Sequence, residues 1–313
     1  MPLDPDARRF LDRLAASGAS GSSTPTVEER RRSLAALLSF AGRARPVGNI
    51  EERTLLGPAS ELRVRIYSPP GVPAREILPG LLYFHGGGFV AGTLDSHDAI
   101  CRALAAACRA KVLSVDYRLA PEHPFPAAIT DGCAALTWAA ARASELGLDG
   151  ARLVVCGDSA GATLAAVVCQ MAATAGQPKV AGQFLICPIT DYAAESDSRR
   201  ALAQGYLLER ATLEHDLHHY LPAGTDRADP RISPLRARRL RALPPTCVHT
   251  AEFDPLRDEG AAYAERLLAA GVRSAHRCHP GMIHLFYGLG ALIPYADTAF
   301  DLMGADVRAL LTR

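Results

Sequence analysis

The sequence lacks any long uninterrupted apolar stretch, the feature that marks a membrane-spanning helix. Its apolar runs are broken well before the ~18 residues that such a helix requires. The N-terminal stretch MPLDPDARRFLDRL also places acids and arginines ahead of any apolar run, unlike the basic start and apolar centre of a signal peptide. We therefore expect no membrane partner and a cytoplasmic location.

An excess of charge of one sign is also absent. The 34 lysines and arginines balance 33 aspartates and glutamates, which leaves a net charge of +1. Such a balance gives no field that would steer the protein toward nucleic acid or anionic lipid. The run Arg30 to Arg32 follows Glu28 and Glu29 on a predicted helix, which favours a solvent-exposed face over a nucleic-acid patch. The sequence thus predicts a small-molecule substrate and no nucleic-acid partner.

Paired-cysteine motifs are missing, although the chain has eight cysteines. None forms a CxxC pair, and all stand among apolar residues, so we expect buried free thiols instead of disulfides or zinc ligands. That usage is typical of a reducing compartment. The eight are Cys101, Cys108, Cys133, Cys156, Cys169, Cys187, Cys247 and Cys278.

The pattern that is present indicates an α/β protein with a large core. Hydrophobic residues make up 49% of the 313 residues. Residues 1–50 predict two helices around a Gly/Ser-rich joint, the second with Thr24 as N-cap and Pro25 at its first position. From residue 52 onward, strand-like runs alternate with alanine-rich helical runs, which predicts a parallel sheet covered on both faces. The predicted strands are 61–67, 81–85, 111–117, 152–157, 182–187, 246–253 and 274–280.

A long insertion interrupts this alternation between Cys187 and Thr246. It contains a helical pattern, LLERATLEHDLHHYL, but no strand of its own. An insertion of about sixty residues inside a compact core is best interpreted as a lid over the sheet. Tyr206, Leu207 and Leu208 are our candidates for the wall of a substrate pocket beneath it.

The segment GDSAG, Gly157 to Gly161, marks a candidate nucleophile. It matches G-x-S-x-G, a strained turn from strand to helix that projects a serine hydroxyl, here that of Ser159, into a cleft. A plain glycine-rich turn with a serine at a helix start gives the same five letters. The neighbouring strand ends must therefore decide between the two interpretations.

The segment HGGGF, His85 to Phe89, leaves an early predicted strand with three consecutive glycines. Bare backbone N–H groups are needed where an oxyanion must be approached without a Cβ in the way. We expect an oxyanion hole from Gly86 and Gly87 with the N–H of Ala160. A phosphate-binding loop is the rival, but neither G-x-x-x-x-G-K-[ST] nor G-x-G-x-x-G is present.

A serine nucleophile needs an imidazole base and a carboxylate to orient it, in the chain order Ser, Asp, His for this fold class. Asp254 ends the predicted strand 246–253, and His284 follows the predicted strand 274–280. Each stands where a loop after a strand is expected. The rival acids are Asp191, Glu252, Asp258 and Glu259, and the rival bases are His276 and His279.

Five motifs in sequence, HGGGF, DYRLAPEHPFPAA, GDSAG, DPLRDEG and GMIH, resemble the hormone-sensitive-lipase-like family of α/β-hydrolases, the bacterial family IV esterases. The resemblance covers residue 52 to the end. It implies an α/β-hydrolase fold with a mostly parallel eight-stranded sheet, helices on both faces, and a helical cap. The implied division is a cap from residues 1–50 and 191–229 over a core from residues 51–190 and 230–313.

The same resemblance implies hydrolysis of short- to medium-chain carboxylic esters without a cofactor or metal. By position it assigns Ser159 as nucleophile, Asp254 as acid, His284 as base, and Gly86, Gly87 and Ala160 as oxyanion donors. It also implies a possible homodimer through the last strand and helix. Two departures from the family pattern are Ala162 and Leu285, where glycine is usual.

Three further interpretations stay open at this stage. An amide or peptide hydrolase would use the same triad, and a ligand receptor would share the fold. Asp158 is expected to act through structure, at the start of a helix. His215, His218 and His219 include an i, i+4 pair that is a weak metal-site candidate, since the sequence identifies no further ligand.

Overall fold

One eight-stranded sheet organises the chain, in the computed structural model that describes residues 1–17, 25–73 and 75–312. The strand order is β1-β2-β4-β3-β5-β6-β7-β8. Strands β3 to β8 run parallel, whereas β2 is antiparallel to both β1 and β4. The expected mostly parallel eight-stranded sheet is confirmed. The strands are β1 (Asn49–Leu56), β2 (Glu61–Ser68), β3 (Leu78–Phe84), β4 (Lys111–Val115), β5 (Leu148–Asp158), β6 (Gly182–Ile186), β7 (Thr246–Phe253) and β8 (Ser274–Ile283).

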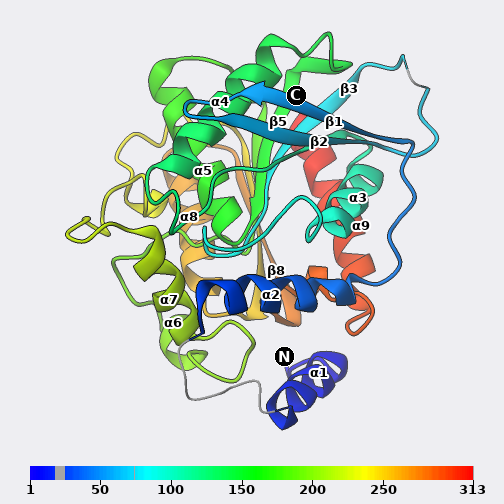
Figure 1. Cartoon of the computed structure of the whole chain (residues 1–313). Helices are drawn as coiled ribbons and strands as arrows, with labels where there is room; N and C mark the ends of the chain where they lie inside the picture. Colours follow the sequence, from blue (N-terminus) through cyan, green and yellow to red (C-terminus); the bar gives the residue numbers. More distant parts are fainter. Residues whose placement is uncertain (18–24, 74, 313) are drawn as a thin grey trace.

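Helices cover both faces of the sheet, which explains why its central strands are apolar throughout (Figure 1). In β3, Leu82 and Phe84 pack into the core under α4, α5 and α8, while Leu81 and Tyr83 pack into the core under α3 and α9. Strands buried on two faces lose the alternation of polar and apolar residues. The longer helices are α1 (Pro5–Ala16), α2 (Val27–Leu38), α3 (Asp98–Cys108), α4 (Ala127–Ala141), α5 (Ala160–Ala175), α7 (Arg210–Tyr220), α8 (Arg257–Ala269) and α9 (Tyr295–Leu311); α6 (Asp197–Ala201) is a short one.

Strand β1 has no counterpart among the predicted strands. It lies at the edge of the sheet and is mostly exposed, with Leu55 as its buried residue. Charged residues are common on such edges because they discourage pairing with other chains. Across the pair, Glu52 stands opposite Arg65 and accepts a hydrogen bond from it at 2.7 Å. Because β1 is rich in charged residues, its sequence lacks the apolar pattern by which the other strands were predicted. The predicted helical segment 1–50 therefore ends inside β1.

The second N-terminal helix begins later than predicted. Thr24 lies outside the described residues, and the N-cap is Thr26, one residue beyond Pro25. The Glu29 N–H donates to the Thr26 hydroxyl, while the Glu29 carboxylate accepts from the Thr26 N–H at 2.8 Å. This reciprocal capping box satisfies two backbone donors that a helix start leaves free. The T-x-x-E spacing in TPTVEE was the signal that could have placed it.

The arginine run of α2 is not the solvent-exposed face that we expected. Arg32 is exposed, as predicted, and it pairs with Glu28. Arg31 reaches the backbone carbonyl of Val90 and pairs with Glu122. Arg30 is largely buried, with 14% of its side chain exposed. The expectation is therefore wrong for two of the three arginines, because α2 packs across the loops that follow the strands.

The cysteines are all free thiols, as predicted, but they are not all buried. Cys278 is exposed on β8 and Cys133 is half-buried, whereas the other six are buried. Within the described ranges, no helix combines the length and apolarity that crossing a bilayer demands.

Candidate active site

The turn after β5 holds Ser159 in a strained conformation. Its φ is 51°, in the left-handed region that side chains rarely adopt, and α5 begins at the next residue. A Cβ on Gly161 would lie 2.0 Å from the Phe84 carbonyl oxygen, and one on Gly157 would lie 2.4 Å from the Gly161 carbonyl oxygen. Only glycine permits this close crossing of strand and helix. The packing therefore supports a serine on a strained corner and not a plain turn.

The tertiary structure brings Ser159, His284 and Asp254 into one line. His284 Nε2 lies 3.2 Å from Ser159 Oγ, and His284 Nδ1 lies 2.7 Å from Asp254 Oδ2. A carboxylate can only accept, so His284 Nδ1–H donates to it and Nε2 is left to accept from the serine hydroxyl. The other carboxylate oxygen accepts the Leu256 N–H at 2.8 Å. All three side chains are buried, which strengthens these interactions.

The rival acids are engaged elsewhere. Each one holds a partner outside the line of three residues, so Asp254 is the carboxylate that orients His284. Asp191 binds Arg236, Glu252 binds the N-terminal amine and the Gly281 N–H, Asp258 binds Ser198 and Arg257, and Glu259 binds Arg199.

The rival histidines lie on β8 and contact residues other than Ser159. His276 Nε2 lies 2.8 Å from the Thr250 hydroxyl. His279 is enclosed between His249 and Tyr295, at 2.9 and 3.1 Å. These contacts make them structural members of the sheet and its packing, so His284 is the histidine that contacts the candidate nucleophile.

The two glycines that line the cavity beside Ser159 are not the expected pair, Gly86 and Gly87. The Gly86 N–H donates to Asp158 Oδ1 at 2.9 Å and is therefore not free to bind an oxyanion. Gly87 and Gly88 line the cavity beside Ser159. Among the described residues, no acceptor takes the N–H of Gly87, Gly88 or Ala160. The geometry therefore favours Gly88 over the expected Gly86 as a donor, and the sequence analysis did not name Gly88. Three consecutive glycines do not reveal which of their N–H groups are occupied.

The Asp158 carboxylate holds the glycine loop in place through hydrogen bonds, which is the structural role expected from the sequence. It is fully buried, and burial raises the pKa of its carboxyl. Besides the Gly86 N–H, it accepts from the hydroxyl of Tyr83 and from that of Tyr287 at 3.1 Å. One carboxylate therefore ties β3, the glycine loop and the segment after His284 together.

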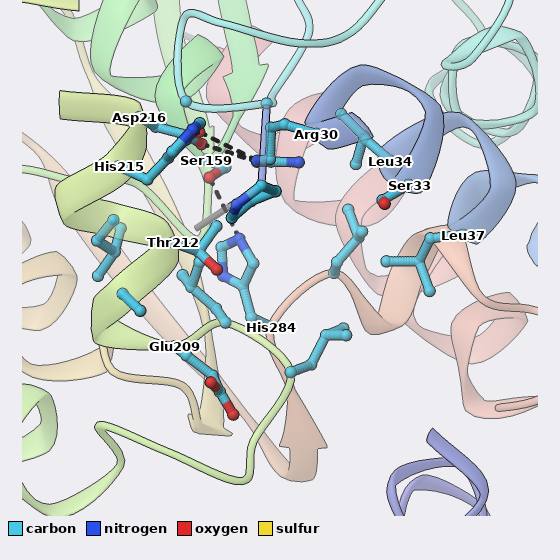
Figure 2. A pocket seen from close by; sticks show the side chains of 18 of the residues that line it. Arg30, Ser33, Leu34, Leu37, Ser159, Glu209, Thr212, His215, Asp216 and His284 are labelled. Carbon is cyan, nitrogen blue, oxygen red and sulfur yellow. Dashed lines mark hydrogen bonds and ion pairs between the residues drawn. The ribbon is translucent and has the colours of Figure 1, made fainter. Parts of the chain in front are cut away.

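A cavity of about 680 Å³ opens above Ser159 and His284. Figure 2 shows Arg30, Ser33, Leu34 and Leu37 of α2 on one side of it and Glu209, Thr212, His215 and Asp216 on the other. Of the pocket candidates from the sequence, Leu207 and Leu208 line the cavity. Tyr206 is absent from its lining and stacks on Phe253, with ring centroids 5.6 Å apart.

The two departures from the family pattern lie at different depths. Leu285 lines the cavity next to His284, with a φ of 63°. Ala162 is fully buried in the first turn of α5 and does not line the cavity. Of the two, Leu285 is the residue that reduces space for a substrate.

The helix α7 histidines do not gather a set of metal ligands. His215 Nδ1 lies 3.1 Å from Asp216, and its ring packs against that of His219. In the part of the chain that the structure describes, the groups of three close donor atoms are elsewhere. One is Cys187 with Asp254 and His284, and the other is Cys247 with His249 and Asp306.

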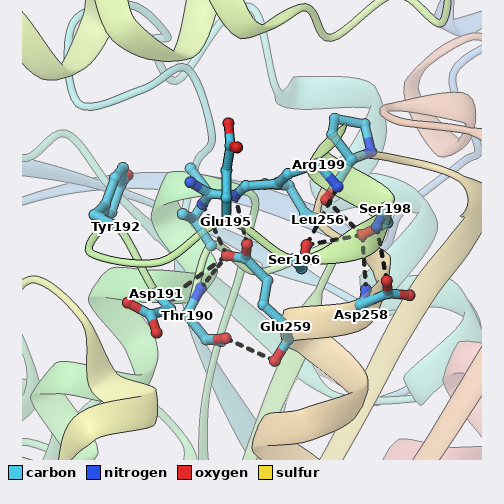
Figure 3. Close-up of polar contacts among 12 residues, drawn as sticks. Thr190, Asp191, Tyr192, Glu195, Ser196, Ser198, Arg199, Leu256, Asp258 and Glu259 are labelled. Atoms are coloured by element: carbon cyan, nitrogen blue, oxygen red, sulfur yellow. Dashed lines mark hydrogen bonds and ion pairs between the residues drawn. The ribbon is translucent and has the colours of Figure 1, made fainter. Parts of the chain in front are cut away.

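A buried polar network fixes the start of the insertion to the loop that carries Asp254 (Figure 3). Glu259 is fully enclosed and holds Arg199 through contacts of 2.6 and 3.0 Å. It also accepts the Thr190 N–H at 2.8 Å. Ser198 donates its hydroxyl to the carbonyl of Pro255, the residue next to Asp254. Burial raises the pKa of Glu259 to about 7, against the opposing effect of Arg199.

We expect Glu259→Gln to lower the free energy of unfolding by about 3–5 kcal/mol at pH 8, because it leaves the Arg199 guanidinium buried without a counter-charge. Urea denaturation followed by circular dichroism measures this. The double variant Arg199→Met, Glu259→Gln should lose less, since no charge is stranded and an acceptor for the Thr190 N–H remains. A single variant as stable as the parent protein would show that the ion pair does not hold the insertion.

Comparison with known proteins identifies the family. A family model described as the alpha/beta hydrolase fold matches residues 81–288. The carboxylesterase NlhH of Mycobacterium tuberculosis is 39% identical over 302 residues, which cover 95% of this chain and 92% of that protein. The ethyl acetate hydrolase of Pseudomonas putida is 38% identical over 304 residues, covering 95% and 96%.

The solved structures agree with this assignment. The ester-hydrolase EH1AB1 from the metagenome of Lake Arreo, in complex with a derivative of bipyridine phosphonate, superposes with a TM-score of 0.94. It is 44% identical and covers 98% of each chain. The chain therefore belongs to the α/β-hydrolase family, in its hormone-sensitive-lipase-like branch.

Proposed function

We propose that the protein is a serine carboxylesterase with Ser159 as nucleophile, His284 as general base and Asp254 as its orienting acid. The alignment of the three side chains at 3.2 and 2.7 Å on the floor of a cavity is the observation that carries this proposal. The names of the relatives, carboxylesterase and ethyl acetate hydrolase, favour an ester over an amide as substrate.

In the first half-reaction, Ser159 Oγ attacks the ester carbonyl carbon while its proton moves to His284 Nε2. The Asp254 carboxylate stabilises the imidazolium that forms. Collapse of the tetrahedral intermediate breaks the bond to the alcohol oxygen, which takes the proton from His284 and leaves. Water then attacks the carbonyl carbon of the acyl-enzyme while His284 takes its proton. The bond to Ser159 Oγ breaks, Oγ takes the proton from His284, and the acid is released.

The oxyanion of each tetrahedral intermediate is assigned to the N–H groups of Gly87, Gly88 and Ala160. Gly87 and Gly88 line the cavity next to Ser159. Ala160 is the first residue of α5, where backbone N–H groups have no partner within the helix. Fixed donors of this kind act where negative charge develops and need no reorganisation during the reaction.

We propose that residues 1–50 and 191–229 form the cap of the site over a core of residues 51–190 and 230–313. Residues of α1, α2 and α7 lining the cavity above Ser159 support this division. Residues 1–17 and 25–50 are the described part of the N-terminal segment. The possible homodimer and the cytoplasmic location stay predictions.

The function is tested with a series of p-nitrophenyl esters from acetate to palmitate. We expect the highest kcat/KM at acyl chains of about eight carbons or fewer, because the cavity has a volume of about 680 Å³ and leucines of α1 and α2 line it. A fluorophosphonate should abolish this hydrolysis and add its mass to the peptide that contains Ser159. A ligand receptor with the same fold would neither turn over the esters nor react.

Two results would contradict the proposal. One is the absence of hydrolysis across the whole series. The other is labelling at a serine other than Ser159 that accompanies the loss of activity. Faster hydrolysis of palmitate than of butyrate would remove the chain-length preference alone.

A further inference from the structure

The lining of the cavity above Ser159 has two chemically different regions. One is formed by leucines of the N-terminal helices, among them Leu14, Leu34 and Leu37. The other holds an ion pair between Arg30 of α2 and Asp216 of α7. Figure 2 shows Arg30 and Asp216 facing each other close to Ser159, with Leu34 and Leu37 farther along α2. An ester bound at Ser159 extends in two directions, so its acyl and alcohol arms meet different surroundings.

The ion pair is buried and leaves donors unused. Arg30 Nε and Nη2 bind the Asp216 carboxylate at 3.1 and 2.8 Å, with 14% and 6% of the two side chains exposed. His215 Nδ1 lies 3.1 Å from the same carboxylate. Within the described residues, Arg30 Nη1 has no acceptor. A guanidinium carries five N–H donors in a planar fork, so the N–H groups of Arg30 Nη1 remain free to donate to an oxygen.

The pair also lies directly on the loop that faces the reacting carbon. A Cβ on Gly88 would come within 1.9 Å of Asp216 Oδ2, so the carboxylate packs against the glycine itself. Gly88 has a φ of 67° and lines the cavity with Ser159. Arg30, bound to this carboxylate, therefore lines the same cavity as Gly88 and Ser159.

The electrostatic surroundings favour an uncharged ligand. Asp216 neutralises Arg30, and the remaining ionisable side chains at the cavity wall include Glu29 and Glu209. A substrate carboxylate would be repelled by these acids at short range, and among the described lining residues no unpaired lysine or arginine compensates them. An ether, carbonyl or hydroxyl oxygen accepts from Arg30 without that repulsion.

We propose that Arg30, held by Asp216, determines specificity by donating a hydrogen bond to a second, uncharged oxygen in one arm of the substrate. The preferred substrates are then diesters, alkoxy esters and acylated polyols instead of simple alkyl esters of equal length. This inference rests on the proposed esterase function and names the substrate class of that same site.

The test compares esters that differ only by an oxygen in place of a methylene. The alcohol-arm pair is 2-methoxyethyl butyrate and butyl butyrate; the acyl-arm pair is ethyl 3-methoxypropanoate and ethyl pentanoate. Rates are normalised to the serine titrated by a fluorophosphonate and divided by the rate of hydroxide hydrolysis, which removes intrinsic reactivity. On one arm we expect the oxygen ester to be preferred by about tenfold or more, the usual value of a hydrogen bond to a charged group.

The variant Arg30→Met, Asp216→Asn removes the donors without leaving an unpaired buried charge, and it keeps an acceptor for His215. We expect it to abolish the preference, so that the ratio within the affected pair of esters falls about tenfold or more. Arg30→Lys, which keeps the charge but not the fork, should lower the ratio as well. Arg32→Met is the matched control on the exposed face of the same helix and should leave both ratios unchanged.

The outcomes separate the two proposals. If no ester is hydrolysed and no serine is titrated, the proposed function fails. If all four esters are hydrolysed but the wild-type protein shows no preference beyond about twofold on either arm, only the specificity inference fails. It fails equally if the preference survives in the double variant. The wild-type comparison decides even if the double variant does not fold.

Discussion

Ser159→Ala is expected to lower kcat for p-nitrophenyl butyrate by on the order of 10⁶-fold, the loss typical of a serine hydrolase without its nucleophile. The residual rate over water comes from the oxyanion donors and substrate binding. Only Oγ is removed, and with it the hydrogen bond between Ser159 and His284. Steady-state assays of the purified variant and the wild-type protein measure the change in kcat.

The fold of the Ser159→Ala variant should be retained. A net loss of about 1 kcal/mol is expected for one hydrogen bond. Alanine has the same Cβ, so the strained φ of 51° costs no more than before. Urea denaturation checks this. A fully folded variant that keeps wild-type turnover, and whose activity co-purifies with it, would remove Ser159 from the mechanism.

Asp254→Asn is expected to lower kcat by about 10⁴-fold with little change in KM. Asparagine keeps the shape of the side chain but offers an amide N–H to His284 Nδ1, which then accepts and carries its proton on Nε2 instead. In that tautomer the imidazole no longer accepts from Ser159. The amide oxygen still accepts the Leu256 N–H that the carboxylate binds at 2.8 Å, so the loop should persist.

Asp191→Asn is the matched control for this loss. Asp191 follows the neighbouring strand β6 and holds Arg236 at 2.8 Å, outside the line of Asp254, His284 and Ser159. It should leave kcat near the wild-type value. If Asp254→Asn were as active as wild type while Asp191→Asn were not, the acid would have to be reassigned.

The predictability of the site differs between its parts. The three side chains of the proposed triad could be predicted to lie together because each follows a strand, and the ends of parallel strands meet at one edge of a sheet. The glycine loop was also predicted to lie beside Ser159, but the sequence did not show that the Gly86 N–H is bound by Asp158. Which of its three N–H groups are free depends on Asp158, which lies 72 residues further along the chain from Gly86.

The edges of the fold were less predictable than its centre. Central strands are buried on both faces and carry continuous apolar runs. Strand β1 carries charge because it has one neighbour and faces solvent. The arginines of α2 likewise give one local pattern, although Arg30 is buried and Arg32 is exposed.

The sequence by itself determined most of the central elements and the residues proposed for the chemistry. Alternating apolar runs specified the parallel sheet, and the glycine motifs marked the two turns where backbone must come close to a reacting atom. The tertiary structure alone decided which groups remain available to a substrate. Asp158 occupies the N–H of Gly86, and Asp216 binds Arg30 from a helix 186 positions away. Long-range partners satisfy some polar groups and leave others free, and that pairing is a property of three-dimensional proximity that local sequence does not contain.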